Sequence, residues 1–367
     1  MTRSCRTRQK KTGVNLSAEP QTDGDQTERN SMNHFGKTLG LASLSAFAAT
    51  QVFALDEVKF GTNWIAQAEH GGYYQSVADG TYEACGLKVT IEPGGPQVNN
   101  RALLLAGKID FHMGGNILQA FSAVKEGIPL KVVAAHFQKE PQVILTHPGQ
   151  GFDTWESLPK ATLFIGDNGF QSYYQWMMTE HGFTAEQRKP YTFNPAPFIA
   201  DKKSGQQGYV TSEPFAIERE GGFKPNSFLL ADYGFNSYAT TVEVMQKTLD
   251  EKSDWVKCFI DGSALGWTNY LYGDNSKANA LIQADNPEMT DEQIAFSIAA
   301  LKQYGIVDSG DSEELGIGAM TDARFENFYN KMVASGVVEA GIDFKASYTL
   351  DYVNKGVGLD IKKSLTK

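Results

Sequence analysis

Between residues 58 and 134, short β-rich apolar runs alternate with segments in which apolar residues recur at helical spacing. Strands that are separated by helices are typical of a parallel sheet with helices packed on its faces. The predicted strands are 58–61, 88–91, 109–113 and 130–134, and the predicted helices are 71–85, 99–106 and 117–126.

The same alternation returns between residues 161 and 231. Here the predicted strands are 162–165, 191–193, 208–211 and 227–231, and the predicted helices are 171–181, 197–203 and 216–220. A chain of 367 residues is also longer than one hydrophobic core usually serves. The pattern therefore predicts two α/β lobes of one design.

Two further β-rich segments, 142–146 and 238–242, are bounded by turn residues and are predicted as hinge strands that cross between the lobes. Lobe one then comprises 55–141 together with 243–367, and lobe two comprises 147–237. After residue 246 the pattern is helical only. The predicted C-terminal helices, which complete lobe one, are 244–272, 276–284, 290–304 and 322–335. The predicted fold class is α/β: two doubly wound lobes joined by crossover strands, with a helical C-terminal segment.

The N-terminal region has the features of an export signal. A basic start at 32–37 leads into an apolar run at 38–52 and then into small residues near 54, which predicts a cleaved signal peptide over 32–54 and a periplasmic location. The alternative is a membrane anchor, but the run is shorter than the roughly 20 apolar residues that a bilayer span needs. The polar residues 1–31 are expected to be a non-native or disordered extension without function. Since no cysteine follows the predicted cleavage point, lipid anchoring is not expected.

Charge and cysteine content narrow the range of partners. The formal net charge is −10, which argues against nucleic acid or anionic lipid as a partner. After removal of the signal peptide the remaining cysteines are Cys85 and Cys258, both in apolar helical stretches. That setting favours buried thiols over a metal site or a disulfide framework, although an oxidising compartment leaves one bridge possible. No cofactor or metal is expected.

Candidate ligand-binding residues follow the predicted strands, because ligands bind outside the carboxyl ends of strands in open α/β sheets. Trp64 can stack on a flat heterocycle, and the Asn63 amide can both donate and accept hydrogen bonds. Glycine-bearing loops let the backbone approach a ligand closely. The loop residues predicted to line the site are Gly94, Gly95, Gly115, Asn116, Asp167, Asn168 and Gly169.

Four further candidates each have a structural alternative. His70 can hydrogen-bond a ligand or serve as a satisfied structural residue. Helical spacing places Tyr74 with the core and leaves Tyr73 to reach the cleft. Glu213 can pair with an amino group and a protonated ring nitrogen, or be a solvated acid at a helix start. Tyr238 supplies aromatic surface near the predicted hinge, where core packing is the alternative.

The sequence contains no recognised nucleophile, zinc or phosphate-binding motif that would indicate catalysis. A binding protein, rather than an enzyme, is therefore expected.

Several motifs together resemble a known family. They are Asn63-Trp64, Glu69 to Tyr74 (Glu-His-Gly-Gly-Tyr-Tyr), Gly86 to Val89, Gly94-Gly95-Pro96, Leu105 to Asp110 and Gly127 to Val132. This combination resembles the substrate-binding proteins of ABC transporters, and most of all the branch that binds thiamine pyrimidine precursors, which is related to eukaryotic thiamine-pyrimidine synthase. The resemblance spans roughly 58–245. It implies a type II periplasmic-binding fold that encloses a small ligand between two lobes, with an inner-membrane permease and its ATPase as partners.

The resulting hypothesis is a monomeric periplasmic protein that captures an aminopyrimidine. The alternatives are a binding protein for another solute, such as a riboflavin precursor, a sulfonate or nitrate, and a thiamine-pyrimidine synthase-like enzyme. The sequence lacks the cysteine-rich iron motif of that synthase.

Overall fold

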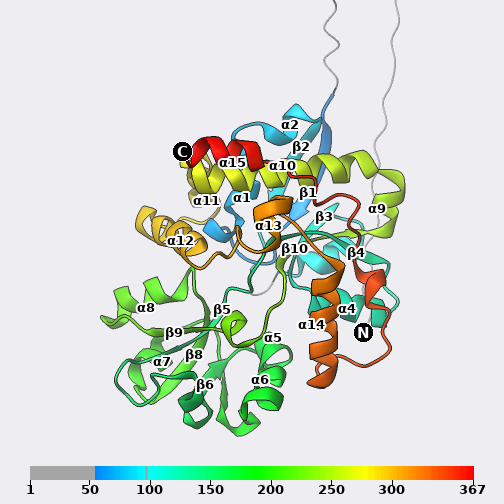
Figure 1. The fold of residues 1–367 in the computed structure, drawn as a ribbon. Coiled ribbons are helices and arrows are strands. Elements are labelled where there is room, and N and C mark those ends of the chain that lie inside the picture. Colours follow the sequence, from blue (N-terminus) through cyan, green and yellow to red (C-terminus); the bar gives the residue numbers. More distant parts are fainter. Residues whose placement is uncertain (1–53, 96–97) are drawn as a thin grey trace, which may run out of the picture. The chain divides into compact units, whose positions relative to one another are not determined.

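The computed structural model describes residues 54–95 and 98–367, and Figure 1 shows the order of their helices and strands. Lobe one is built on a sheet with the strand order β2-β1-β3-β10-β4. Its strands are β1 (Asp56–Gly61), β2 (Leu87–Glu92), β3 (Phe111–Asn116), β4 (Leu130–Phe137) and β10 (Ala239–Met245).

Helices cover this sheet, and α1 packs along the long helix α10 (Figure 1). Tyr73 of α1 and Phe259 of α10 belong to the aromatic cluster between helices and sheet, in which Phe111 and Phe259 stack with ring centroids 4.3 Å apart. The helices of lobe one are α1 (Gly71–Ala78), α2 (Thr81–Ala84), α3 (Asn100–Leu105), α4 (Leu118–Lys125), α9 (Gln246–Glu251), α10 (Ser253–Tyr272), α11 (Ser276–Asp285), α12 (Asp291–Gln303), α13 (Asp311–Leu315), α14 (Asp322–Ala334) and α15 (Leu359–Leu365), with the short 3-10 helices η1 (Ala68–His70) and η5 (Phe344–Ser347).

Lobe two has a sheet with the strand order β7-β6-β8-β5-β9. Its strands are β5 (Gln142–Thr146), β6 (Thr162–Ile165), β7 (Arg188–Pro190), β8 (Ser204–Tyr209) and β9 (Asn226–Leu229). Its helices are α5 (Asp167–Phe170), α6 (Tyr173–His181), α7 (Ala196–Ala200) and α8 (Glu213–Gly221), with the 3-10 helices η2 (Trp155–Lys160), η3 (Ala185–Gln187) and η4 (Leu230–Tyr233).

Both sheets are mixed, whereas the alternation of strands and helices predicts parallel sheets. In lobe one β10 runs antiparallel to β3 and β4, and in lobe two β5 runs antiparallel to β8 and β9. These two strands are the first of each lobe to follow a crossing from the other lobe. Since no crossover helix precedes either of them within its own sheet, neither needs to run parallel to its neighbours.

The two segments predicted as hinge strands are strands within the sheets. β5 lies between β8 and β9, and β10 lies between β3 and β4. The chain therefore crosses between the sheets outside these strands, at 138–141 and at 230–238.

Several element boundaries differ from the predicted ones for local reasons. The helix predicted over 71–85 is split into α1 and α2 at Gly80, which has a left-handed φ of 75°. The strand predicted over 191–193 lies three residues earlier, as β7, and Phe193 itself has φ 62°. Neither α13 nor α15 is among the predicted helices.

Cys85 and Cys258 form a disulfide, so the preference for two buried thiols is wrong and the alternative of one bridge is correct. Their Cα atoms are 5.7 Å apart, although 173 residues separate them in sequence. The bridge fastens the end of α2 to α10, a contact between remote segments that helical periodicity does not reveal.

Candidate functional site

Trp64 and Phe193 form an aromatic pair between the two lobes. Trp64 follows β1, and the Thr62 hydroxyl fixes the turn by donating to the Trp64 carbonyl over 2.8 Å. Phe193 lies in the loop after β7, and 48% of its surface is exposed. The two ring centroids are 4.8 Å apart, and the ring planes are inclined by 49°. An aromatic side chain of lobe one thus contacts an aromatic side chain of lobe two at the ends of the two sheets.

On the lobe-one side, the structure brings Asn63, Gly94 and Gly115 together. A Cβ on Gly94 would lie 2.5 Å from the Thr62 carbonyl oxygen and 2.7 Å from the Asn63 carbonyl carbon, so only glycine allows these two backbones to approach. A Cβ on Gly115 would lie 3.9 Å from Asn63 Nδ2. The Asn63 amide is therefore held beside the ends of β2 and β3, as the sequence predicts.

Asn116 and Gly95 are at the same edge of the sheet. Asn116 Nδ2 donates to Glu140 Oε2 over 3.1 Å, and Asn116 Oδ1 accepts a hydrogen bond from the Leu118 amide over 3.2 Å. Gly95 is partly buried, and a Cβ there would lie 3.3 Å from Ile65.

The predicted loop of lobe two is arranged differently for each of its three residues. Asp167 is exposed and forms an ion pair with Arg188, and Asn168 is exposed as well. Gly169 is buried, and a Cβ there would lie 2.4 Å from the hydroxyl oxygen of Tyr173. This loop thus holds Tyr173 in place through Gly169, while the Asp167 carboxylate is engaged by a cation.

Glu213 begins α8 at the junction between the lobes. Its Oε2 accepts the Tyr209 amide over 2.6 Å, and this bond spans the turn from β8 into the helix. Part of the Glu213 side chain reaches solvent, but the surrounding protein raises the pKa of its carboxyl group to about 7, mainly by desolvation. Because part of this partly buried carboxyl group reaches solvent, a ligand can contact it.

Glu69 of η1 faces Glu213 from lobe one. Its side chain is 3% exposed, and its Oε1 accepts a hydrogen bond from the Thr211 hydroxyl of lobe two. Its other oxygen, Oε2, is buried without a hydrogen-bond partner among the described residues. Desolvation raises the pKa of Glu69 to about 7, and the charge of Glu213 adds to the increase.

Glu140 is the third buried carboxyl group, and it lies in the first crossing segment. Desolvation raises its pKa to about 7 as well, against the opposing effect of the hydrogen bond from Asn116. Burial raises the pKa of Tyr209 well above its usual value, and the charges of Glu140, Glu213 and Glu69 contribute in that order. The three carboxyl groups therefore surround Tyr209. Within 54–95 and 98–367, none of the three forms an ion pair with a lysine, arginine or histidine.

Three predicted site residues, Tyr73, Tyr238 and His70, lie in the protein core. Tyr73 is fully buried and its hydroxyl pairs with His136 Nδ1 over 2.9 Å, so it does not reach the cleft as helical spacing predicts. Tyr73 is covered by α10, where it lies against Phe259 and Trp267, and Tyr74 donates to Asp285 of α11. Tyr238 is buried, and its hydroxyl donates to Asp311 over 2.5 Å.

His70 is also buried, and desolvation lowers its pKa to about 3. The ring is therefore neutral at physiological pH. Its Nδ1 has no hydrogen-bond partner within the described part of the chain.

Sequence reasoning missed Phe193, Glu140 and Tyr173 as residues of this junction, and it assigned no role to Glu69. Phe193 lies in a segment predicted as a strand, and Glu140 lies in a segment between lobes that has no periodicity. Tyr209 also belongs to this junction: it ends β8, two residues before Thr211 and four before Glu213.

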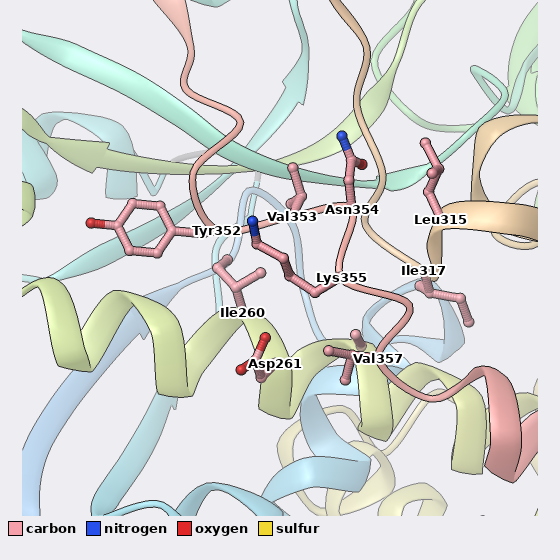
Figure 2. A pocket seen from close by; sticks show the side chains of 10 residues that line it. Ile260, Asp261, Leu315, Ile317, Tyr352, Val353, Asn354, Lys355 and Val357 are labelled. Atoms are coloured by element: carbon pink, nitrogen blue, oxygen red, sulfur yellow. The ribbon is translucent and has the colours of Figure 1, made fainter.

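A separate hollow lies between α10 and the C-terminal segment, away from this junction. Figure 2 shows Ile260 and Asp261 of α10 facing Val353, Lys355 and Val357. Its volume of about 10 Å³ is enough for about one water molecule, so it is not a site for an organic ligand.

In the part of the chain that the structure describes, no group of His, Cys, Asp and Glu is arranged to hold a metal ion. No helix among the same residues is long and apolar enough to cross a membrane. The predicted signal peptide at 32–54 lies outside the described residues, apart from residue 54.

Solved structures show what fold this is. The periplasmic aliphatic sulphonate-binding protein SsuA of Escherichia coli superimposes with a TM-score of 0.56 at 14% identity, covering 80% of this chain and 92% of that one. The desulfurization enzyme DSZB superimposes with a TM-score of 0.53 at 11% identity, covering 85% of this chain and all of that one. The predicted periplasmic-binding fold is confirmed. The fold carries both binding proteins and an enzyme.

Sequence comparison is more specific. The riboflavin-binding protein RibY of Chloroflexus aurantiacus is 22% identical over 314 residues, which covers 82% of this chain and 87% of that protein. The family model described as NMT1/THI5-like matches residues 67–275, which include η1, both crossing segments and Glu213. The match covers more than half of the chain and confirms the resemblance inferred from the motifs: the chain belongs to the NMT1/THI5-like family.

Proposed function

We propose that this protein is the solute-binding component of an ABC importer and that it captures an aminopyrimidine, a precursor of the thiamine pyrimidine, between its lobes. The observation that carries the proposal is the Trp64–Phe193 pair, which lies at a junction whose carboxyl groups have no cationic partner among the described residues. Aromatic side chains bind flat rings, and carboxyl groups favour a ligand that donates hydrogen bonds or carries positive charge.

Stacking between the lobes requires movement. Ring centroids 4.8 Å apart leave no room for a third ring, because a sandwich needs about 7 Å, twice the contact distance of about 3.5 Å. The ligand would enter when the lobes part, and it would then replace the direct contact between Trp64 and Phe193. Ligand contacts made from both lobes would shift the population toward the closed state.

Glu213 would form hydrogen bonds with the polar edge of the ligand. An aminopyrimidine presents an amino group beside a ring nitrogen, and a carboxylate can accept from both when that nitrogen is protonated. When the carboxyl group holds the proton instead, it donates to the ring nitrogen and accepts from the amino group. A pKa of about 7 makes both arrangements available near neutral pH. Asn63 would complete recognition from lobe one, since its amide can both donate and accept.

A flavin is the second candidate, favoured by the similarity to RibY. Its fused ring is also flat and rich in hydrogen-bonding nitrogen, so stacking alone does not separate it from an aminopyrimidine. A sulfonate fits less well, because its permanent negative charge would meet three carboxyl groups that no cation of 54–95 or 98–367 pairs with. For the same site we propose binding rather than catalysis.

A solute-binding component of an ABC importer also has a defined location and defined partners. The protein would be exported to the periplasm, act as a monomer and deliver its ligand to an inner-membrane permease with its ATPase. The Cys85–Cys258 disulfide supports an oxidising compartment.

Isothermal titration calorimetry would test the ligand. We expect heat of binding with hydroxymethylpyrimidine or formylaminopyrimidine, and weaker or no binding with thiamine, riboflavin and an alkanesulfonate. Glu213→Gln should weaken aminopyrimidine binding, while Glu218→Gln, an exposed acid one turn along α8, should leave it unchanged. Tight binding of riboflavin alone would show that the ligand is a flavin and not an aminopyrimidine. Tight binding of a sulfonate would contradict the inference that the carboxyl groups exclude anionic ligands.

A further inference from the structure

Arg324 of α14 contacts both segments that cross between the lobes. Its guanidinium group donates to the Gln138 carbonyl in the first crossing segment and to Asn236 Oδ1, 2.8 Å away, in the second. It also lies over the ring of Tyr238, with 4.0 Å between the guanidinium carbon and the ring centroid. One side chain thus joins two segments that lie almost 100 residues apart, since Asn236 is 98 positions after Gln138.

Both crossings are fastened to lobe one where Arg324 contacts them. The amides of Gln138 and Lys139 donate to the Ile306 carbonyl over 2.6 and 3.2 Å. The Gln138 side chain donates to the carbonyls of Ala135 and Ala319. The first crossing is therefore part of lobe one as far as Lys139.

The second crossing is fastened in the same way. The Tyr238 hydroxyl donates to Asp311 and accepts the Thr321 amide over 3.1 Å. Asp311 also lies 4.0 Å from the Arg324 guanidinium group. Together these contacts form a cluster around the Arg324 guanidinium group. We call it the Arg324 clamp, and it consists of Arg324, Gln138, Asn236, Tyr238 and Asp311.

Attachment to lobe two begins three residues after Gln138 of the clamp and one residue before Asn236. The Pro141 carbonyl accepts the Val210 amide over 2.9 Å, so Pro141 already belongs to the sheet of lobe two. On the return, the Phe235 amide donates to the Leu230 carbonyl over 3.0 Å and closes the turn after β9. The backbone that lies between these attachments is 139–141 in the first crossing and 235–236 in the second.

We propose that Arg324 is a positioning residue that fixes the pivot of lobe closure. The clamp holds the two crossing segments together on lobe one, so that rotation takes place at the two short segments beyond it. Arg324 would affect ligand binding through the balance between open and closed lobes, without touching the ligand. Glu140 lies on this pivot and bonds to Asn116, which couples the pivot to the junction. The link to ligand binding rests on the proposed function, but the effect on lobe position does not.

The test measures the distance between nitroxide labels on Glu126→Cys in lobe one and Lys202→Cys in lobe two, both exposed positions, by pulsed electron spin resonance in ligand-free protein. In Arg324→Gln the distance distribution should broaden and its mean should shift, because a neutral amide cannot hold both segments. Arg324→Lys, which keeps the charge but loses the forked geometry, should fall between the two. Lys257→Gln is the control: this exposed lysine pairs with Asp261 within α10 of lobe one, contacts neither crossing segment and should leave the distribution unchanged.

Asn236→Ala removes one hydrogen-bond acceptor of Arg324 at an exposed position. It replaces Arg324→Gln in this test if that variant does not fold. The proposal is overturned if folded Arg324→Gln or Asn236→Ala gives the wild-type distribution, whatever its melting temperature. For whichever of hydroxymethylpyrimidine and riboflavin binds, Arg324→Gln should raise the apparent Kd by about tenfold, because a hinge equilibrium scales the affinity of any closed-state ligand. If neither binds the wild type, the proposed ligand class fails while the distance measurement still decides the role of Arg324.

Discussion

The ring of Phe193 reaches across the junction to Trp64 from a backbone conformation that favours glycine. Its φ of 62° lies in the left-handed region, which costs a side-chain-bearing residue roughly 1–2 kcal/mol. Phe193 is also half exposed, so burial of the ring does not compensate fully for this cost. A strained, exposed aromatic residue that faces another aromatic residue is the kind of local outlier that accompanies ligand binding.

Replacement of Phe193 should separate binding from folding. We expect Phe193→Gly to change the free energy of unfolding by less than about 1 kcal/mol, because relief of the left-handed strain offsets the greater entropy of glycine in the unfolded chain. Loss of one stacked ring should weaken binding of the aminopyrimidine by about 1–3 kcal/mol, which is roughly 5- to 150-fold. Urea unfolding and calorimetry measure the two quantities.

Phe193→Trp is the control for this pair, since it keeps an aromatic ring and should retain most of the affinity. A Phe193→Gly protein that binds as tightly as the wild type would remove Phe193 from the proposed site.

The hydrogen bond from Thr211 to Glu69 should stabilise the contact between the lobes. Thr211→Val keeps the shape of the side chain but leaves the Glu69 carboxyl group buried without its donor, so we expect a loss of about 1–3 kcal/mol in the free energy of unfolding. Thr211→Ser keeps the hydroxyl group and should lose less. A loss in Thr211→Ser with none in Thr211→Val would show that the methyl group, and not the hydrogen bond, makes the contribution.

Stability should increase as the pH falls from 8 to 6. Glu69 and Glu140 have pKa values of about 7 in the folded protein, well above the ordinary value near 4.5. Folded protein therefore binds more protons than unfolded protein between about pH 4.5 and 7. The contribution is fully present below the unfolded pKa and is lost as the pH rises through 7. We expect a gain on the order of 3 kcal/mol between pH 8 and pH 6 from chemical unfolding curves, because each of the two groups contributes about 1.4 kcal/mol.

His70 and His136 oppose this trend at lower pH. Burial lowers both pKa values to about 3, so the unfolded chain takes up protons on these rings below about pH 6.5 while the folded protein does not. The increase in stability should flatten there. Glu69→Gln should reduce the increase between pH 8 and 6, and a Glu83→Gln control on exposed α2 should preserve it. A slope that is unaffected by Glu69→Gln would mean that other groups cause the pH dependence.

Reduction of the Cys85–Cys258 bridge should destabilise the protein. The bridge joins residues 173 positions apart, and removal of a native disulfide typically costs about 2–5 kcal/mol. The melting temperature should fall on addition of dithiothreitol. The Cys85→Ala/Cys258→Ala protein should melt near the reduced value and show no response to the reductant. An unchanged melting temperature after verified reduction would contradict a stabilising role.

Local sequence determined the alternation of strands and helices, because each strand and helix needs an apolar face of its own period. It also placed Asn63, Trp64 and Gly94 at strand ends, which the topology of an α/β sheet turns toward the ligand. The NMT1/THI5-like relationship was likewise readable from motifs that lie within single loops and helix starts. In all these cases the information lies within a few consecutive residues.

Contacts between distant segments were decided only by the tertiary structure. The reversed direction of β5 and β10, the disulfide and the burial of Tyr73 beneath α10 depend on which segments become neighbours after the chain crosses between lobes. The same holds for the meeting of Trp64 with Phe193, for the three carboxyl groups around Tyr209 and for the Arg324 clamp. The desolvation that raises the carboxyl pKa values comes from the packed protein around them, and no property of Glu69, Glu140 or Glu213 in the sequence records it.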